Sequence, residues 1–258
     1  MSTIIYPSPI FGPVHSRRLG VSLGINLLPS DGKWCSFDCV YCECGLNAHR
    51  RPHQPLPTRQ QVADGLEERL REMKENGPKP DVLTFAGNGE PTLHPQFPEI
   101  VDDVCALRDR YFPEARISVL SNATQIDRPE VLKALCRVDN PILKLDTVDP
   151  SYIATVDRPR KAYNVEHLAS IMQGVGGYIV IQTMFMGGTL DGQSVDNTGE
   201  KYVVPWLQAI ARIHPRQVMI YTIDRETPVA TLQKATRESL DSIAEQVRQL
   251  GIECSVSY

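Results

Sequence analysis

Short apolar runs alternate with amphipathic stretches along most of this chain. The strand-like runs cover residues 21–28, 82–86, 117–120, 142–146, 178–184, 218–223 and 252–258. Helix-like stretches lie between them, at 58–76, 98–110, 127–135, 165–172, 202–213 and 236–250, with caps expected at Thr58 and Asp127. Strands separated by helices in this order predict a parallel sheet with right-handed crossovers. We therefore expect an α/β fold, a partial (β/α)6-type TIM barrel with parallel strands; the alternative is an open doubly wound sheet.

The composition is that of an ordinary folded protein. Of 258 residues, 41% are hydrophobic and 22% are charged, which excludes a disordered chain. No apolar run approaches the ~20 residues of a membrane span, and no signal peptide is visible, so we expect a cytoplasmic protein without a membrane partner. The net charge of −4 argues against a broad nucleic-acid surface and against DNA as a partner. No linker or repeat divides the chain, which predicts a single domain over residues 1–258.

Candidate functional residues follow the strands at the end where parallel α/β folds gather function. A cysteine-rich segment follows the first strand, and residues 87–90 (Gly-Asn-Gly-Glu) follow the second. Ser121 and Asn122 follow the third strand, and Asp146 ends the fourth. We expect all of them on one rim.

Four of the seven cysteines lie close together, at Cys35, Cys39, Cys42 and Cys44. In a chain without a secretory signal, such a segment indicates metal rather than disulfides. Structural zinc commonly takes two close pairs of ligands, and the absence of a second pair argues against it. A small zinc knuckle is the alternative. A 4Fe–4S cluster takes thiolates, and the C-x3-C-x2-C spacing of the first three cysteines leaves one iron without a protein ligand. Only one residue separates Cys44 from Cys42, so we expect Cys44 not to bind; its binding would close the cluster.

The C-x3-C-x2-C spacing, with Tyr41 before the third cysteine, resembles the signature of the radical S-adenosylmethionine (SAM) superfamily. Residues 87–91 (GNGEP) resemble its glycine-rich turn, which contacts the methionine amino group of SAM. Residues 12–20, 22–26, 87–95, 120–124 and 158–159 are similar to a subgroup of Fe–S oxidoreductases that includes wyosine-type tRNA-modifying synthases. The resemblance implies a radical SAM core domain, with residues 1–34 as N-terminal lead and first strand and residues 35–57 as cluster-binding loop.

The resemblance also implies a reaction. The cofactors are a 4Fe–4S cluster and SAM, which chelates the open iron; reductive cleavage gives a 5′-deoxyadenosyl radical that abstracts hydrogen from substrate. A one-electron donor such as flavodoxin or ferredoxin is needed, and the substrate is an RNA base or a small molecule. Wyosine-type synthases carry upstream cysteines for a second cluster, but no cysteine precedes Cys35 here, which argues against that mechanism and against tRNA.

The residue types fit these roles. A carboxylate at Glu90 suits an ammonium group, and glycines at 87 and 89 allow a close backbone approach; an ordinary strand-exit turn is the alternative. Tyr41 suits adenine or simple packing, and Ser121 and Asn122 suit ribose hydroxyls or a carboxylate. The expected metal ligands are Cys35, Cys39 and Cys42, and the expected cofactor-binding residues are Tyr41, Gly87, Asn88, Gly89, Glu90, Ser121, Asn122, Asp146 and Gln182.

Lys144 and Arg158 are the candidate catalytic residues. Strand alternation places Lys144 and Asp146 on one face, and a lysine facing the barrel interior needs an anionic partner; the alternative is reversed facing with Lys144 at an edge. Gln182 shares that interior by the same parity. Arg158 suits an anionic substrate group or is simply solvated.

Three segments stay open to more than one interpretation. Basic loops at 15–18 and 49–53 flank the cluster segment and suit phosphate. Residues 187–199 are polar and glycine-rich, which predicts a mobile loop over substrate or a disordered surface loop. The rival functions are a glycyl-radical activating enzyme for a protein partner, and a non-catalytic Fe–S electron carrier or zinc-binding adaptor.

Overall fold

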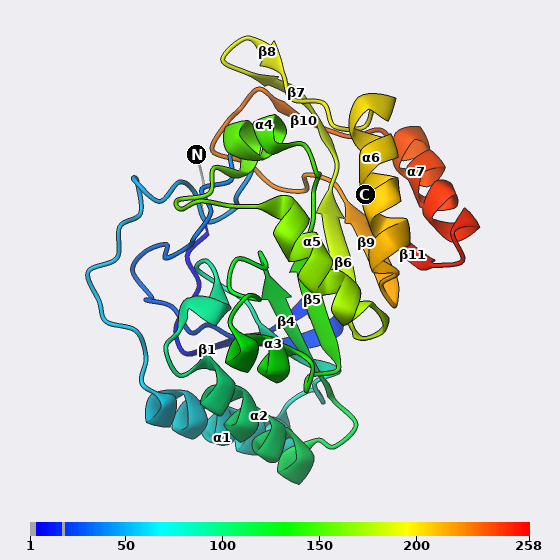
Figure 1. Ribbon diagram of the computed structural model, residues 1–258. Helices are drawn as coiled ribbons and strands as arrows, with labels where there is room; N and C mark the ends of the chain where they lie inside the picture. Colours follow the sequence, from blue (N-terminus) through cyan, green and yellow to red (C-terminus); the bar gives the residue numbers. More distant parts are fainter. Residues whose placement is uncertain (1–3, 17–18) are drawn as a thin grey trace.

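The computed structural model describes residues 4–16 and 19–258, and one curled sheet forms its centre (Figure 1). Neighbouring strands follow the order β1-β2-β3-β4-β5-β6-β9-β11, and every pair is parallel except β1 with β2. Because β1 and β11 are its two edges, the sheet is the expected partial barrel. The strands are β1 Ile10–Ser16, β2 Gly20–Ile25, β3 Val82–Phe85, β4 Arg116–Ser121, β5 Asn140–Lys144, β6 Val180–Met184, β9 Gln217–Tyr221 and β11 Glu253–Ser257.

Helices connect the parallel strands. The hydroxyl of Thr58 accepts from the backbone of Gln61, and the Gln61 side chain accepts from Thr58, which is the expected capping box. The expected cap at Asp127 is wrong: the third helix starts at Pro129, whose fixed φ suits a first turn. No helix in the described ranges is long and apolar enough to cross a membrane. The helices are α1 Arg59–Asn76, α2 Phe97–Tyr111, α3 Pro129–Leu135, α4 Pro150–Tyr152, α5 Val165–Gly174, α6 Glu200–Ile213 and α7 Arg237–Gln249, with 3-10 turns Pro91–Leu93 and Gly176–Tyr178 and a π-helical turn Ile153–Asp157.

Alternate strand residues divide the helix-facing core from the barrel interior. Leu143 and Ile181 belong to the main apolar core beneath the helices. Their neighbours Ile142 and Val180 belong to a small separate cluster inside the barrel. Since side chains alternate along a strand, Lys144 lies on the interior face with Ile142.

Two β features depart from the sequence prediction. β1 pairs with β2 although Gly12 and Pro13 interrupt any alternating pattern there. Residues 187–199 contain a hairpin rather than a disordered loop, with Asp191 and Gly192 at positive φ in its turn. This second sheet has the order β10-β7-β8, from Leu232–Lys234, Met186–Leu190 and Gln193–Ser194 (Figure 1).

Candidate active site

Backbone hydrogen bonds hold the cysteine-rich segment on both sides, after it leaves the carboxyl end of β2. On one side the Val40 amide donates to the Val156 carbonyl at 2.9 Å, which joins the segment to the π-helical turn. On the other side the Trp34 amide donates to the Asn88 carbonyl at 2.8 Å, and the Glu90 amide donates to the Trp34 carbonyl at 3.2 Å. The cysteines therefore lie between the loop after β3 and the loop after β5, on the expected rim.

The cysteine thiols influence one another electrostatically. Burial raises the pKa of Cys35 to about 12 and raises that of Cys39 well above its usual value. A hydrogen bond from the Cys44 thiol, assisted by the Lys33 ammonium, lowers the pKa of Cys42 to about 6. Lys33 is thus a buried cation beside the thiol group.

The donor chemistry fits a 4Fe–4S cluster with three protein ligands. The Cys44 thiol donates to the Gly87 carbonyl oxygen at 3.4 Å, so it is already engaged as a hydrogen-bond donor. No three His, Cys, Asp or Glu side chains in the described part of the chain are placed to hold one metal ion. A cuboidal cluster distributes its thiolates over different irons, so it does not need ligands that converge on one point.

The glycine-rich turn packs closely against its neighbours because two positions lack a side chain: a Cβ at Gly87 would meet Asn26, and one at Gly89 would meet the cysteine segment. Gly87 and Gly89 have φ of 134° and 140°, and a Cβ added to Gly89 would lie 2.0 Å from the Trp34 carbonyl oxygen. Asn88, between them, directs its side chain elsewhere: Nδ2 donates to the Tyr6 carbonyl at 2.8 Å. The turn therefore offers its backbone, not the Asn88 amide, to the space beside the cysteines.

Glu90 is almost completely buried and joins the ends of β3 and β4. Its Oε1 accepts from the hydroxyls of Thr92 at 2.5 Å and Ser121 at 2.8 Å, and its Oε2 accepts from the Asn122 amide at 2.6 Å. Burial raises its pKa despite these donors. The Asn122 side chain also donates to the Cys35 sulfur at 3.5 Å. Since Oε2 accepts a single bond here, it retains capacity for one more donor.

Lys144 lies between two buried carboxylates inside the barrel. Its Nζ is 2.6 Å from Asp146 and 2.7 Å from Asp157, and the Tyr41 hydroxyl donates to the same oxygen of Asp146. Burial disfavours the ammonium, but the two carboxylates outweigh it and raise the pKa of Lys144 well above its usual value. Lys144 is therefore a permanent cation rather than a free amine.

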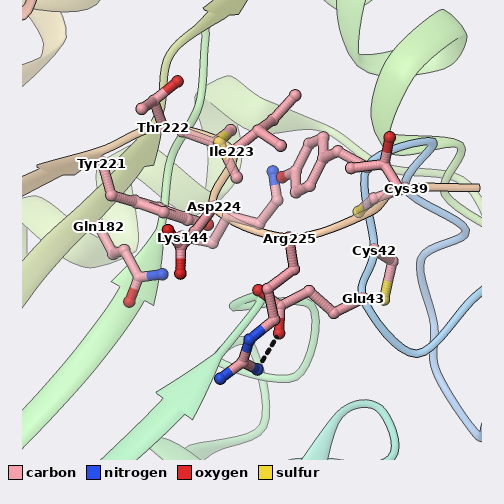
Figure 2. Close-up of a pocket in the computed structure, with 13 residues that line it drawn as sticks. Cys39, Cys42, Glu43, Lys144, Gln182, Tyr221, Thr222, Ile223, Asp224 and Arg225 are labelled. Carbon is pink, nitrogen blue, oxygen red and sulfur yellow. Dashed lines mark hydrogen bonds and ion pairs between the residues drawn. The ribbon is translucent and has the colours of Figure 1, made fainter. Parts of the chain in front are cut away.

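A cavity of about 290 Å³ opens between the cysteine segment and the ends of β5, β6 and β9 (Figure 2). Lys144 and Gln182, paired in register, both border it. Arg225 lies at the front of the view in Figure 2 and binds the Glu43 carboxylate at 2.7 Å. This ion pair joins the loop after β9 to the cysteine segment.

Four residues around the site had no clear sequence signal. Lys33 is buried and donates to the Gly45 carbonyl at 2.7 Å; its place two residues before Cys35 was the only hint. Asp157 is brought in by the π-helical turn, while Glu43 and Arg225 are ordinary charged residues in sequence. These four residues lie around the site only because the fold brings their segments together.

Of the predicted basic features, Arg158 lies apart from the cavity. The Arg158 guanidinium donates to the Thr155 carbonyl at 3.1 Å. Its backbone instead supports the cysteine segment, since the Asp38 amide donates to the Arg158 carbonyl at 3.1 Å. Within the basic loop 15–18, Arg17 and Arg18 lie outside the described residues.

Known proteins match most of this chain in sequence. A UPF0026 protein of Methanocaldococcus jannaschii is 30% identical over 217 residues, which are 82% of this chain and 62% of that protein. A UPF0026 protein of Helicobacter pylori strain 26695 is 32% identical, over 85% of this chain and 67% of its own length. The chain thus spans about two thirds of the length of these relatives.

Solved structures share the fold at low sequence identity. A radical SAM methyltransferase from Sphaerobacter thermophilus matches with a TM-score of 0.67 and 14% identity, over 92% of this chain and 66% of that one. A structure of TYW1 with a lysine-pyruvate adduct bound matches with a TM-score of 0.62 and 13% identity, over 88% and 73%. The family model described as "Radical SAM superfamily" matches residues 30–198, which include the cysteines, the glycine-rich turn and β3 to β6. The chain therefore belongs to the radical SAM superfamily, a family of enzymes that use a 4Fe–4S cluster and S-adenosylmethionine.

Proposed function

We propose that this chain binds a 4Fe–4S cluster through Cys35, Cys39 and Cys42, cleaves SAM reductively and abstracts hydrogen from a small molecule or a single RNA base. Residues 1–258 are assigned to one radical SAM core domain. The observation that carries the proposal is that one cavity is bordered by Cys39 and Cys42 on one side and by Lys144 and Gln182 on the other. A substrate in that cavity lies beside the cluster ligands.

When bound, the cluster and SAM supply a one-electron cleavage that yields a 5′-deoxyadenosyl radical. The backbone carbonyls of residues 87–90 and the remaining acceptor site of Glu90 Oε2 would hold the amino group of SAM. Asn122, fixed by Glu90 and close to Cys35, would orient the carboxylate end of SAM or its ribose, and Ser121 holds Glu90 in place. Tyr41 presents its ring to the cavity and is anchored through Asp146.

Lys144 organises the substrate side. With two carboxylates on its ammonium, it does not act as a base or as a nucleophilic amine at neutral pH. Its ammonium bridges Asp146 and Asp157, which leaves Gln182 as a polar group that can meet the substrate.

Anaerobic reconstitution with iron and sulfide, followed by dithionite and SAM, tests the proposal. Chromatography should show 5′-deoxyadenosine with the parent chain and none with Cys39→Ala. Cys136→Ala is the matched control, because Cys136 ends α3 away from the cavity and its removal should leave product formation intact. Absence of 5′-deoxyadenosine from a chain that holds four irons would refute the proposed function.

A further inference from the structure

A large aromatic side chain is exposed directly beside a cysteine of the cluster segment. The side chain of Trp34 is 48% exposed, and the next residue is Cys35. Most large apolar side chains in this fold are buried, and backbone hydrogen bonds to residues 88 and 90 hold Trp34 in place. Tryptophan is the residue type that most often anchors a protein interface.

Basic loops flank Trp34 on both sides. The Arg50 carbonyl accepts from the Lys33 amide at 2.6 Å, which places residues 49–53 against the start of the cysteine segment. The Arg160 amide donates to the Ser36 carbonyl at 2.9 Å, which places residues 158–161 against its other side. In Figure 1 the loop before α5 extends toward the blue and cyan loops that follow β2. We name Trp34, Arg51, Arg160 and Lys161 the basic face.

The charge of this face is opposite to that of the whole chain. Its cations are the exposed side chains of Arg51, Arg160 and Lys161, and Asp31 and Asp38 are carboxylates of the neighbouring segment. Asp31 accepts from the backbone amides of residues 53 and 54, and Asp38 faces the buried Lys33 ammonium at 3.5 Å. The net charge of the chain is −4, so this face is positive on a chain that is negative overall. Such a patch steers an acidic partner and accelerates its association.

From these observations we propose that the basic face docks an acidic one-electron carrier protein, which delivers electrons to the cluster through the Trp34–Cys35 segment. The inference rests on the proposed function, which requires a one-electron donor. Transient redox complexes are small, commonly below ~1,200 Å² of buried surface, so one exposed tryptophan with a cationic rim suffices. RNA is the less suitable partner, because a single-strand platform uses several aromatics and because no residue of the basic face borders the cavity.

The test compares two reductants with one reconstituted protein. Reduced flavodoxin serves as the acidic carrier, and stopped-flow absorbance follows reduction of the cluster. In a second assay dithionite replaces flavodoxin, and the 5′-deoxyadenosine formed from SAM is measured, which does not depend on docking. The variant is Arg51→Glu with Arg160→Glu. Its control is Lys79→Glu with Lys133→Glu, which makes the same change in net charge at exposed positions before β3 and on α3.

The charge reversal should lower the bimolecular rate with flavodoxin about tenfold at low salt, and the difference should shrink at high salt. Dithionite-driven 5′-deoxyadenosine should be unchanged, which also shows that the variant folds. Trp34→Ala should weaken flavodoxin binding, whereas Tyr178→Ala, at another exposed aromatic, should not. An unchanged flavodoxin rate in the basic-face variant, or an equal loss in the Lys79 and Lys133 control, would overturn the proposal.

Two further outcomes separate the alternatives. If the Arg51 and Arg160 variant loses binding of bulk tRNA while its rate of reduction by flavodoxin is unchanged, the face belongs to RNA and the docking proposal is wrong. If dithionite yields no 5′-deoxyadenosine while flavodoxin still reduces the cluster in a manner sensitive to the basic face, docking stands and the proposed reaction fails.

Discussion

Gly89→Ala is the sharpest test of how the two motifs are held together. An added Cβ would lie 2.0 Å from the Trp34 carbonyl oxygen, and φ at this position is 140°. A side chain in such a conformation costs about 1–3 kcal/mol. The clash also displaces Trp34, whose two backbone hydrogen bonds to residues 88 and 90 contribute about 0.5–1.5 kcal/mol each. We expect the free energy of unfolding to fall by about 2–6 kcal/mol.

Two other glycines serve as matched controls. Gly192 has φ of 79°, and nothing lies within 4 Å of an added Cβ, so Gly192→Ala measures the backbone cost alone. Gly174→Ala meets no atom and has no positive φ, so it should be neutral or stabilising. Urea unfolding gives each free energy, and iron content after reconstitution should fall only for Gly89→Ala. If Gly89→Ala costs no more than Gly192→Ala, the Trp34 contact does not hold the motifs together.

Three other expectations concern buried groups. Lys144→Met leaves two buried carboxylates unpaired and should cost about 3–5 kcal/mol in urea unfolding. Adding Asp157→Asn should recover part of that loss; no recovery would mean that packing rather than charge dominates. Cys44→Ala should keep four irons per chain by iron and sulfide analysis, whereas Cys39→Ala should lose them; loss in both would make Cys44 a ligand. Burial lowers the pKa of His94, whose neutral ring donates to the Pro57 carbonyl. The neutral ring therefore stabilises the fold fully above the unfolded pKa of about 6.5, and this stabilisation is lost as pH falls through the folded pKa. His94→Gln should therefore flatten the decline in urea midpoint between neutral and acidic pH, and identical slopes would contradict this.

Periodicity alone was sufficient for the parallel sheet. Each strand-like run corresponds to a parallel strand, because apolar residues that face the helices must recur at every second position. Periodicity did not predict β1, because Gly12 and Pro13 break the alternation of apolar residues there and pairing with β2 decides the conformation. It also failed for the hairpin at β7 and β8, although Asp191-Gly192 is a turn signal that the polar composition obscured.

The positions of the candidate site's motifs were predictable from their spacing, whereas the roles of their residues stay a prediction. The three cysteines and the glycine-rich turn are local motifs, and their common rim follows from parallel strand order. Lys33 and Asp157 could not be found in this way, because their roles depend on burial and on partners contributed by distant segments. Asn88 shows the converse: it belongs to the motif, yet its side chain binds the Tyr6 carbonyl, 82 residues away in sequence.

The site also has two sides with different surroundings. Cys39 and Cys42 border the cavity, where we place the substrate, whereas Cys35 follows the exposed Trp34 on the basic face. A carrier protein docked at Trp34 therefore does not compete with a substrate in the cavity, and neither has to leave before the other binds. On the cavity side, Lys144 is already paired with two carboxylates, so a polar substrate does not have to neutralise a bare buried charge. Charge reversals on the basic face should consequently change electron delivery without changing the substrate that the cavity selects.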